Sequence, residues 1–139
     1  MEYLVDANVL SEPTKPDPDT HVVAWLRLNA GQLKVSSIVL GELEYGVLLL
    51  PDGKKRRQLE TWLASARGRF PILDFDSGCA EAWAGLLAKM KKSGRAMPIK
   101  DSLIAATALT HKLAVATRNT RDFAHAGVLV VNPFEHDEN

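Results

Sequence analysis

Short apolar runs alternate with helix-forming segments along the whole chain, and no other feature of the sequence restricts the fold as strongly. The runs expected to form strands cover residues 3–5, 33–35, 71–75, 113–116 and 128–131. The helical patterns between them cover about 20–28, 38–50, 51–67, 76–93 and 98–110, with a short helical turn at 119–124. Strands that alternate with helices favour a mainly parallel sheet with helices on both of its faces. We therefore predict a single α/β domain over residues 1–139, with a central sheet of four to five short strands and a protruding helical hairpin over 37–67.

The charge balance argues against a protein that holds nucleic acid by net charge alone. Lys plus Arg and Asp plus Glu number 17 each, so the net charge is zero, whereas a chain that binds by bulk charge would be basic. Cys79 is the single cysteine, as is typical of a protein in a reducing compartment. The N-terminus lacks the lysines and the long apolar stretch of a signal peptide, and no apolar run approaches the ~20 residues that span a bilayer. We expect a soluble, cytoplasmic protein with no membrane contact.

One acidic residue comes directly after an expected strand, and a second lies in the turn that follows another strand. In an open parallel sheet, ligands bind in the crevice beyond the carboxyl ends of the strands. Asp6 follows the strand over 3–5, and Asp122 lies in the turn after the strand over 113–116. Each also has a purely structural explanation, because Asp6 could cap a helical turn and Asp122 could be the third residue of a turn capped by Asn119. Their positions make both acids candidates for a site and leave the two explanations open.

Two further acids lie on helices that start at the same edge of the sheet. At 100° per residue, Glu42 falls near the apolar side of the helix over 38–50, whereas Glu44 points almost the opposite way. An inward carboxylate is costly unless a cation meets it, so Glu42 belongs either to a metal site or to a buried ion pair with an Arg or Lys. Asp101 lies in the first turn after Pro98, where an acid also interacts favourably with the helix dipole. That helix is apolar or small on almost every side, which indicates a central helix whose N-terminus points into the crevice.

Four acids that converge in a cleft repel one another, and divalent cations relieve that repulsion. Ligation by carboxylates alone favours Mg²⁺ or Mn²⁺ over zinc. The histidines offer no zinc set, because they are scattered at positions 21, 111, 125 and 136. Metals held by acids typically serve phosphodiester hydrolysis, where they activate a water and neutralise the phosphate oxygens. The sequence contains no serine-hydrolase elbow, P-loop or dinucleotide fingerprint.

Basic residues gather around the later acids. Between Gly85 and Arg121 the single acid is Asp101, against eight basic residues: Lys89, Lys91, Lys92, Arg95, Lys100, Lys112, Arg118 and Arg121. These could hold the backbone phosphates of a polyanion, and we predict Lys100, Arg118 and Arg121 as substrate contacts. A second basic cluster at 54–57 could do the same. Both groups could also be solvated helix faces.

Five segments of the sequence resemble the PIN-domain ribonucleases of the VapC and FitB type. They are YLVDANVLSE at 3–12, GELEYG at 41–46, DSLIAATA at 101–108, ATRNTRDF at 116–123 and GVLVVNPF at 127–134. The match runs in order through the whole chain, and the five segments together are specific to this family although each alone is weak. The resemblance implies a metal-binding acidic site of Asp6, Glu42, Asp101 and Asp122, with Thr117 and Asn119 as supporting polar residues.

In the implied site, Asp6 and Asp101 are the main metal ligands, and Glu42 and Asp122 complete it directly or through water. Many PIN domains carry another acid where Asn119 stands, which implies that a second metal is held weakly or not at all. The resemblance also implies the toxin of a toxin-antitoxin pair: a homodimeric endoribonuclease that hydrolyses RNA with Mg²⁺, or Mn²⁺ as a substitute, and is silenced by a cognate antitoxin. Apolar residues of the hairpin could form the dimer or antitoxin surface, or simply pack in the core: Leu48, Leu49, Leu50, Leu59, Trp62 and Leu63.

Rival interpretations come from other classes of protein. The first is a catalytically silent PIN-like binding module that acts through a protein partner. A receiver-type signalling module would use Asp74 or Asp76 as phosphate acceptor, but Asp6 lacks the paired acid normally found at the end of its first strand. A haloacid-dehalogenase-like phosphatase would need an aspartate where Asn8 stands. Since all four expected acids are present, we rank the metal-dependent endoribonuclease above the silent binding module.

Overall fold

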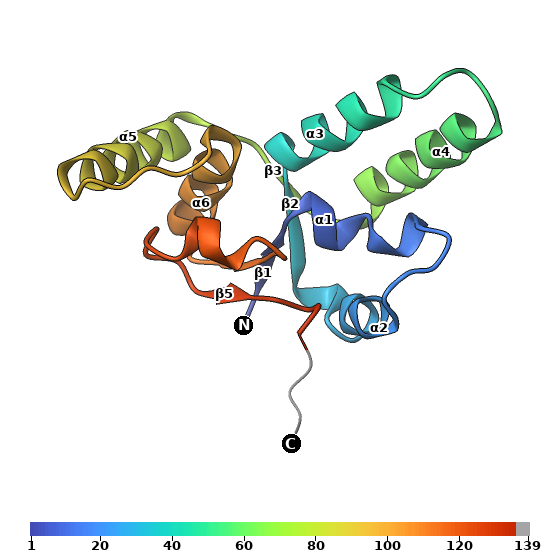
Figure 1. Cartoon of the computed structure of the whole chain (residues 1–139), viewed down its shortest axis with the longest axis horizontal. Helices are drawn as coiled ribbons and strands as arrows, with labels where there is room; N and C mark the ends of the chain where they lie inside the picture. The colour runs from blue at the N-terminus through green and yellow to red at the C-terminus, as the bar shows by residue number, and fades with distance from the viewer. Residues whose placement is uncertain (136–139) are drawn as a thin grey trace.

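The expected strands form one sheet in the computed structural model, which describes residues 1–135 (Figure 1). They are β1 (Tyr3–Val5), β2 (Leu33–Ser36), β3 (Ile72–Leu73), β4 (Ala114–Ala116) and β5 (Val130–Val131). All neighbouring pairs are parallel, in the order β3-β2-β1-β4-β5. The predicted α/β class and parallel sheet are therefore confirmed, whereas His136 lies outside the described residues.

The connections between the strands are mostly helical. The helices are α1 (Ala7–Leu10), η1 (Glu12–Thr14), α2 (Thr20–Leu28), η2 (Ala30–Gln32), α3 (Ser37–Leu48), α4 (Lys54–Arg69), α5 (Ser77–Lys92), α6 (Ile99–His111) and η3 (Thr120–Phe123), where η marks a 3₁₀ helix. Helices α2, α3 and α5 begin at capping residues, because the side chains of Asp19, Ser36 and Asp76 accept hydrogen bonds from N–H groups of the first turn. None of the helices within residues 1–135 is long and apolar enough to cross a membrane.

The strand order explains where a ligand site can form. Strands β2 and β3 follow one another on one side of β1, and β4 and β5 lie on its other side. At such a switch point the connections leave in opposite directions, so a crevice opens beyond the carboxyl ends of the two central strands. In Figure 1, α5 and α6 lie on one side of the strands and α1 to α4 on the other. Asp6 follows β1 and Thr117 follows β4, so both residues lie at this crevice.

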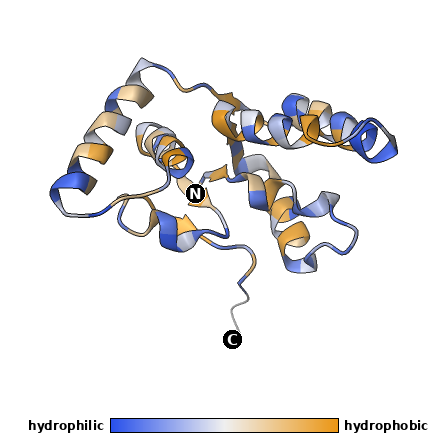
Figure 2. Cartoon of the chain, turned by 45° about the horizontal axis from the view of Figure 1, so that its top comes forward, coloured by the Kyte–Doolittle hydropathy of each residue, from blue (hydrophilic) through white to orange (hydrophobic). Residues whose placement is uncertain are grey.

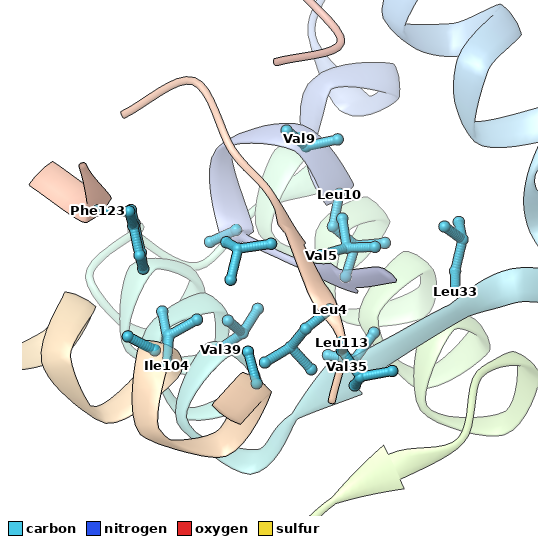
Figure 3. Packing of buried hydrophobic residues seen from close by; sticks show 14 of the residues in the cluster. Leu4, Val5, Val9, Leu10, Leu33, Val35, Val39, Ile104, Leu113 and Phe123 are labelled. Carbon is cyan, nitrogen blue, oxygen red and sulfur yellow. The ribbon is translucent and has the colours of Figure 1, made fainter. Parts of the chain in front are cut away.

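Aliphatic side chains pack the sheet against its helices. Leu4 of β1 and Val35 of β2 are 0% and 1% exposed, and Val39 of α3 and Ile104 of α6 are both fully buried. Figure 3 shows these four side chains in one cluster between the strands and the helices. Each buried aliphatic side chain stabilises the fold by roughly 1.5–3 kcal/mol. The same packing fixes the positions of α3 and α6, the two helices that carry candidate site acids.

Helices α3 and α4 form the predicted hairpin, which extends away from the sheet (Figure 1). Its second helix, α4, consists mostly of hydrophilic residues, whereas α3 also contains many apolar ones (Figure 2). The apolar residues of the hairpin divide between the two expected roles. Leu63 is buried, and Leu59 and Trp62 pack partly against the core. Leu48 and Leu49 are 56% and 67% exposed, so these two remain candidates for a contact with another protein.

The two outer strands are shorter than the sequence pattern predicts. In β3 and β5 two residues of each strand pair with a neighbour. Pro71 has no N–H to donate, and Phe75 leaves the strand direction because its N–H donates to Ser37 Oγ at 3.2 Å. The apolar pattern thus marks the segments that approach the core, while the length of each edge strand depends on the single neighbour it can pair with.

Candidate active site

Asp6 lies at the carboxyl end of β1 and is fully buried. Val5 pairs in register with Ala116 of β4, so the residues that follow, Asp6 and Thr117, lie side by side. The Thr117 hydroxyl donates to Asp6 Oδ2 at 2.7 Å, and the Ala7 N–H donates to Asp6 Oδ1 at 2.8 Å. Asp6 therefore caps α1 through Oδ1 and also lies at the crevice, where Oδ2 contacts Thr117.

The segment after β4 is held to Asp6 through Thr117. The Asn119 N–H donates to Thr117 Oγ1 at 3.0 Å, and the Asn119 carbonyl accepts from the Asp122 N–H at 3.1 Å. Within residues 1–135, the Asn119 side chain forms no hydrogen bond. Asn119 therefore supports the loop through its backbone, and the turn that carries Asp122 is fixed relative to Asp6.

Asn8 also belongs to this network, although it was not among the residues predicted for the site. Its amide Nδ2 lies 3.5 Å from both Asp6 Oδ2 and Thr117 Oγ1, at the limit of a hydrogen bond. Its carbonyl Oδ1 accepts from the Arg118 N–H at 3.1 Å. Asn8 thus ties the loop after β1 to the loop after β4. Its position two residues after Asp6, at the start of a helical turn, is the sequence signal that could have identified it.

Asp101 lies in the first turn of α6 and is 2% exposed. Its Oδ1 atom is buried without a hydrogen-bond partner. Burial raises the pKa of the Asp101 carboxyl to about 6, and the charge of Lys100 opposes this rise. The negative charges of Asp6 and Asp122 raise that pKa further. Asp6 and Asp122 are thus near enough for their charges to act on the Asp101 carboxyl.

Glu42 pairs with a lysine, which is one of the two alternatives left open by the sequence. Lys100 Nζ lies 2.7 Å from Glu42 Oε2 and 3.8 Å from Asp101 Oδ1. Burial alone would lower the pKa of the Lys100 ammonium, but its hydrogen bond to Glu42 and the surrounding negative charges outweigh burial and raise that pKa. Glu42 Oε1 is buried without a partner. Glu44 instead forms an exposed ion pair with Arg67 at 3.6 Å, as its outward direction predicted.

The three basic residues predicted to touch substrate have different surroundings. Lys100 lies among the acids. Arg118 is exposed, and its guanidinium stacks over the Phe134 ring at 4.2 Å from the ring centroid. Arg121 is exposed on η3 and lines a hollow together with Asp122. The structure therefore brings Lys100 into the acidic cluster itself and leaves the two arginines on the loop beside it.

The donor set fits a hard divalent cation. It consists of carboxylate oxygens, and two of these, on Glu42 and Asp101, are buried with no hydrogen-bond partner. Within residues 1–135, no three acidic, histidine or cysteine side chains already converge as a metal centre. The ammonium group of Lys100 stands among the carboxylates. A cation that entered would therefore meet unsatisfied oxygens and would compete with Lys100 for Glu42.

Known proteins resemble this chain over almost all of its length. A PIN domain is matched over residues 3–129. The chain is 42% identical to "Toxin FitB" of Neisseria gonorrhoeae over 140 residues, which cover 96% of this chain and 99% of that protein. It is 37% identical to "VapC ribonuclease Y4jK" of Sinorhizobium fredii over 138 residues, covering 95% and 97% of the two chains.

The fold is shared with solved structures as well. It is similar to FitAcB from Neisseria gonorrhoeae, with a TM-score of 0.88, 40% identity, and coverage of 96% of this chain and 99% of that chain. It is also similar to a toxin-antitoxin complex from Klebsiella pneumoniae, with a TM-score of 0.74, 27% identity, and coverage of 97% and 100%. With a family match over nearly the whole chain and relatives above 30% identity, this protein belongs to the PIN-domain family, in the group of the VapC and FitB toxins.

Proposed function

We propose that this PIN-domain protein is a divalent-metal-dependent endoribonuclease that acts as the toxin of a toxin-antitoxin pair. The observation that carries the proposal is the group of acids at the β1/β4 crevice, of which Asp6 and Asp101 are buried, with unsatisfied oxygens on Glu42 and Asp101. Buried carboxylates are costly, so such acids indicate a site that binds a cation or substrate. The name of the relative "VapC ribonuclease Y4jK" supports RNA as the substrate class.

In this proposal, Asp6 and Asp101 would hold Mg²⁺, and Glu42 and Asp122 would complete the site directly or through water. A bound divalent cation supplies an activated water and neutralises the charge of the attacked phosphate. Thr117 orients Asp6 by donating to Oδ2, so that the carboxylate keeps one direction relative to the crevice. Asn8 and Asn119 hold the two loops that carry these groups. Lys100 balances part of the negative charge when no metal is present.

The second candidate is a catalytically silent domain that acts through a protein partner. A silent domain needs no unsatisfied carboxylate oxygens, and replacing these acids with apolar residues would stabilise it. All four acids are kept here. The ribonuclease name of a relative that is 37% identical also favours the enzyme.

We also propose a cognate antitoxin and a homodimer as partners. The toxin-antitoxin complex among the similar structures supports an antitoxin. The exposed apolar side chains of Tyr45, Leu48 and Leu49 on α3 offer a surface that another protein chain could cover. The single cysteine supports a location in the cytoplasm, where both an antitoxin and RNA would meet the protein.

Cleavage of a panel of tRNAs and structured RNAs tests the proposed function. The purified, partner-free protein is incubated with Mg²⁺, with Mn²⁺ or with EDTA, beside the Asp6→Asn variant. We expect cuts that need a divalent cation and that vanish in the variant. Equal cutting by both proteins would show a contaminating nuclease, and no cutting of any RNA by a folded, partner-free protein would favour the silent binding domain.

Lys100→Met is expected to tighten Mn²⁺ binding by up to about fivefold. The substitution removes the ammonium group that pairs with Glu42 at 2.7 Å and would compete with the metal, and one partly exposed ion pair corresponds to up to about 1 kcal/mol. Isothermal titration calorimetry with Mn²⁺ measures the change, with Lys91→Met on the exposed face of α5 as control. Unchanged or weaker Mn²⁺ binding in Lys100→Met would contradict the competition.

Thr117→Val is expected to weaken Mn²⁺ binding by roughly tenfold, because groups that orient a metal ligand typically change affinity by 10- to 100-fold. The substitution keeps the shape of the side chain but removes the hydroxyl that donates to Asp6 at 2.7 Å. Thr107→Val is the matched control, since Thr107 is equally buried and its hydroxyl donates to the Leu103 carbonyl within α6. The assignment fails if both variants bind Mn²⁺ as the wild type does.

A further inference from the structure

A hollow of about 290 Å³ lies beside the acidic site. It forms where the loop after α5 meets η3 and the turn that follows it. Its walls are made by Met90, Arg95, Ala96, Arg121, Asp122 and His125. Asp122 is thus shared between this hollow and the group of acids coupled to Asp101. A ligand that extends out of the acidic site past Asp122 would enter the hollow.

The two arginines of the hollow have no ion-pair partner in the described part of the chain. Among residues 1–135, the side chains of Arg95 and Arg121 form no ion pair, hydrogen bond or ring contact. The exposed side chains of Arg27 and Arg57 are also unpaired within these residues, whereas other arginines have acidic partners. Arg56 pairs with Asp52 and Glu60, and Arg67 pairs with Glu44.

The grouping of two unpaired arginines in one hollow indicates what the hollow is suited to bind. Asp122 lines the same hollow but forms no ion pair with either arginine. The guanidinium group matches phosphate oxygens with two parallel hydrogen bonds, which gives Arg a strong preference for phosphates. His125, at the rim, adds a third group that can donate a hydrogen bond to an anion.

We propose that this hollow binds a backbone phosphate of the RNA strand next to the phosphate that is cleaved, with Arg95 and Arg121 as its ligands. This inference rests on the proposed ribonuclease function and names a substrate subsite for it. At about 290 Å³ the hollow is at the small end of ligand pockets, which suits one phosphate or one nucleotide rather than a folded RNA element. Contacts to phosphates position the strand without reading its bases, so this subsite fixes which bond reaches the acids and leaves base choice to other residues.

Binding of a short, fluorescent, single-stranded RNA of mixed sequence tests the subsite. The Asp6→Asn variant serves as parent, so that the RNA stays intact in Mg²⁺, and Arg95→Ala and Arg121→Ala are added to it singly. Each arginine variant is expected to weaken binding by roughly three- to tenfold, and to make the dependence of log affinity on log salt concentration less steep by about 0.7, the value for one phosphate contact to a single strand. Arg27→Ala is the control, because Arg27 is exposed on α2, forms no ion pair within residues 1–135, and lines a different hollow.

Three results would overturn the proposal. They are no loss of RNA affinity in either arginine variant, an equal loss in Arg27→Ala, and no measurable RNA binding by the parent. A titration with inorganic phosphate, followed by NMR of the arginine side chains, separates the sources of the anion. Phosphate binding that depends on Arg95 and Arg121 without an effect on RNA would show a site for a free anion and would reject the RNA subsite.

The RNA-binding test of the subsite and the cleavage test of the ribonuclease function can fail separately. If wild-type protein cuts RNA but the arginine variants bind RNA normally, the subsite is wrong and the ribonuclease function stands. If no RNA is cut while both arginines still contribute to RNA binding, the hollow binds RNA and the catalytic proposal fails.

Discussion

Asp101→Asn is expected to lower metal-dependent RNA cleavage by at least about a hundredfold and, in the same protein, to stabilise the metal-free fold at neutral pH. The loss of cleavage follows because a metal contributes several kcal/mol to phosphate hydrolysis and this substitution removes one of the two proposed main ligands. The gain in stability follows because the Asp101 carboxylate is buried and lies near the charges of Asp6 and Asp122. An asparagine has nearly the same shape and no charge.

The sign of the pH dependence follows from the raised pKa. The Asp101 carboxyl has a pKa of about 6 in the folded protein, against an ordinary value of 3.8. The folded state therefore binds the proton more tightly than the unfolded chain does. This contribution to the free energy of unfolding is fully present below pH 3.8 and is lost as the pH rises through about 6. A shift of about two units corresponds to at most about 3 kcal/mol, and the lost interactions of Asp101 with Lys100 and the helix dipole reduce the net gain to roughly 1–2 kcal/mol.

Thermal unfolding in EDTA, measured on both sides of pH 6, tests this expectation. We expect the melting temperature of the wild type to fall relative to that of Asp101→Asn as the pH rises, and the variant to melt roughly 5 °C higher at neutral pH. Asp17→Asn, at an exposed carboxylate in the loop before α2, is the control and should follow the wild type. A variant with the same pH dependence as the wild type, or with full metal-dependent cleavage, would contradict the role given to Asp101.

Phe123→Ala is expected to lower the free energy of unfolding by about 3–5 kcal/mol, the usual cost of removing a fully buried phenylalanine. Phe123 is 0% exposed and belongs to the hydrophobic core, which it joins from η3 (Figure 3). It directly follows Asp122, so its ring anchors the segment that carries this acid. The cavity left by alanine would loosen that segment, and RNA cleavage should fall along with stability.

Urea unfolding measures this cost, and Phe123→Leu serves as the matched variant. Leucine refills most of the cavity and is expected to lose clearly less stability than alanine. Phe134→Ala provides a second comparison, because Phe134 is only partly buried and should cost less. A loss below about 1 kcal/mol for Phe123→Ala would show that η3 does not depend on this ring.

Much of the fold could be predicted from the sequence because the relevant signals are local. The apolar runs and the capping side chains Asp19, Ser36 and Asp76 located the helices and strands within a few residues. The ends of β3 and β5 could not be predicted, since the length of an edge strand depends on its one neighbour. The strand order, which places β4 beside β1, is likewise set by contacts between segments far apart in the chain.

The candidate site shows the same division. Helical periodicity was enough to predict that Glu42 points inward and Glu44 points outward. It could not identify Lys100 as the partner of Glu42, because 58 residues separate the two side chains along the chain. The contact between Asp6 and Thr117 depends on the register of β1 and β4. Asn8 was missed for the same reason, since its role depends on Arg118 and the loop after β4.

Metal binding by the acids can be measured directly. Mn²⁺ is titrated into the partner-free wild type and into Asp6→Asn and Asp101→Asn, binding is followed by electron paramagnetic resonance, and RNA cleavage is measured on the same samples. We expect the wild type to bind Mn²⁺ and to cut RNA, and each variant to bind Mn²⁺ at least about tenfold more weakly and to lose cleavage. Equal Mn²⁺ binding by all three proteins would contradict the central claim that Asp6 and Asp101 hold the metal that this ribonuclease needs.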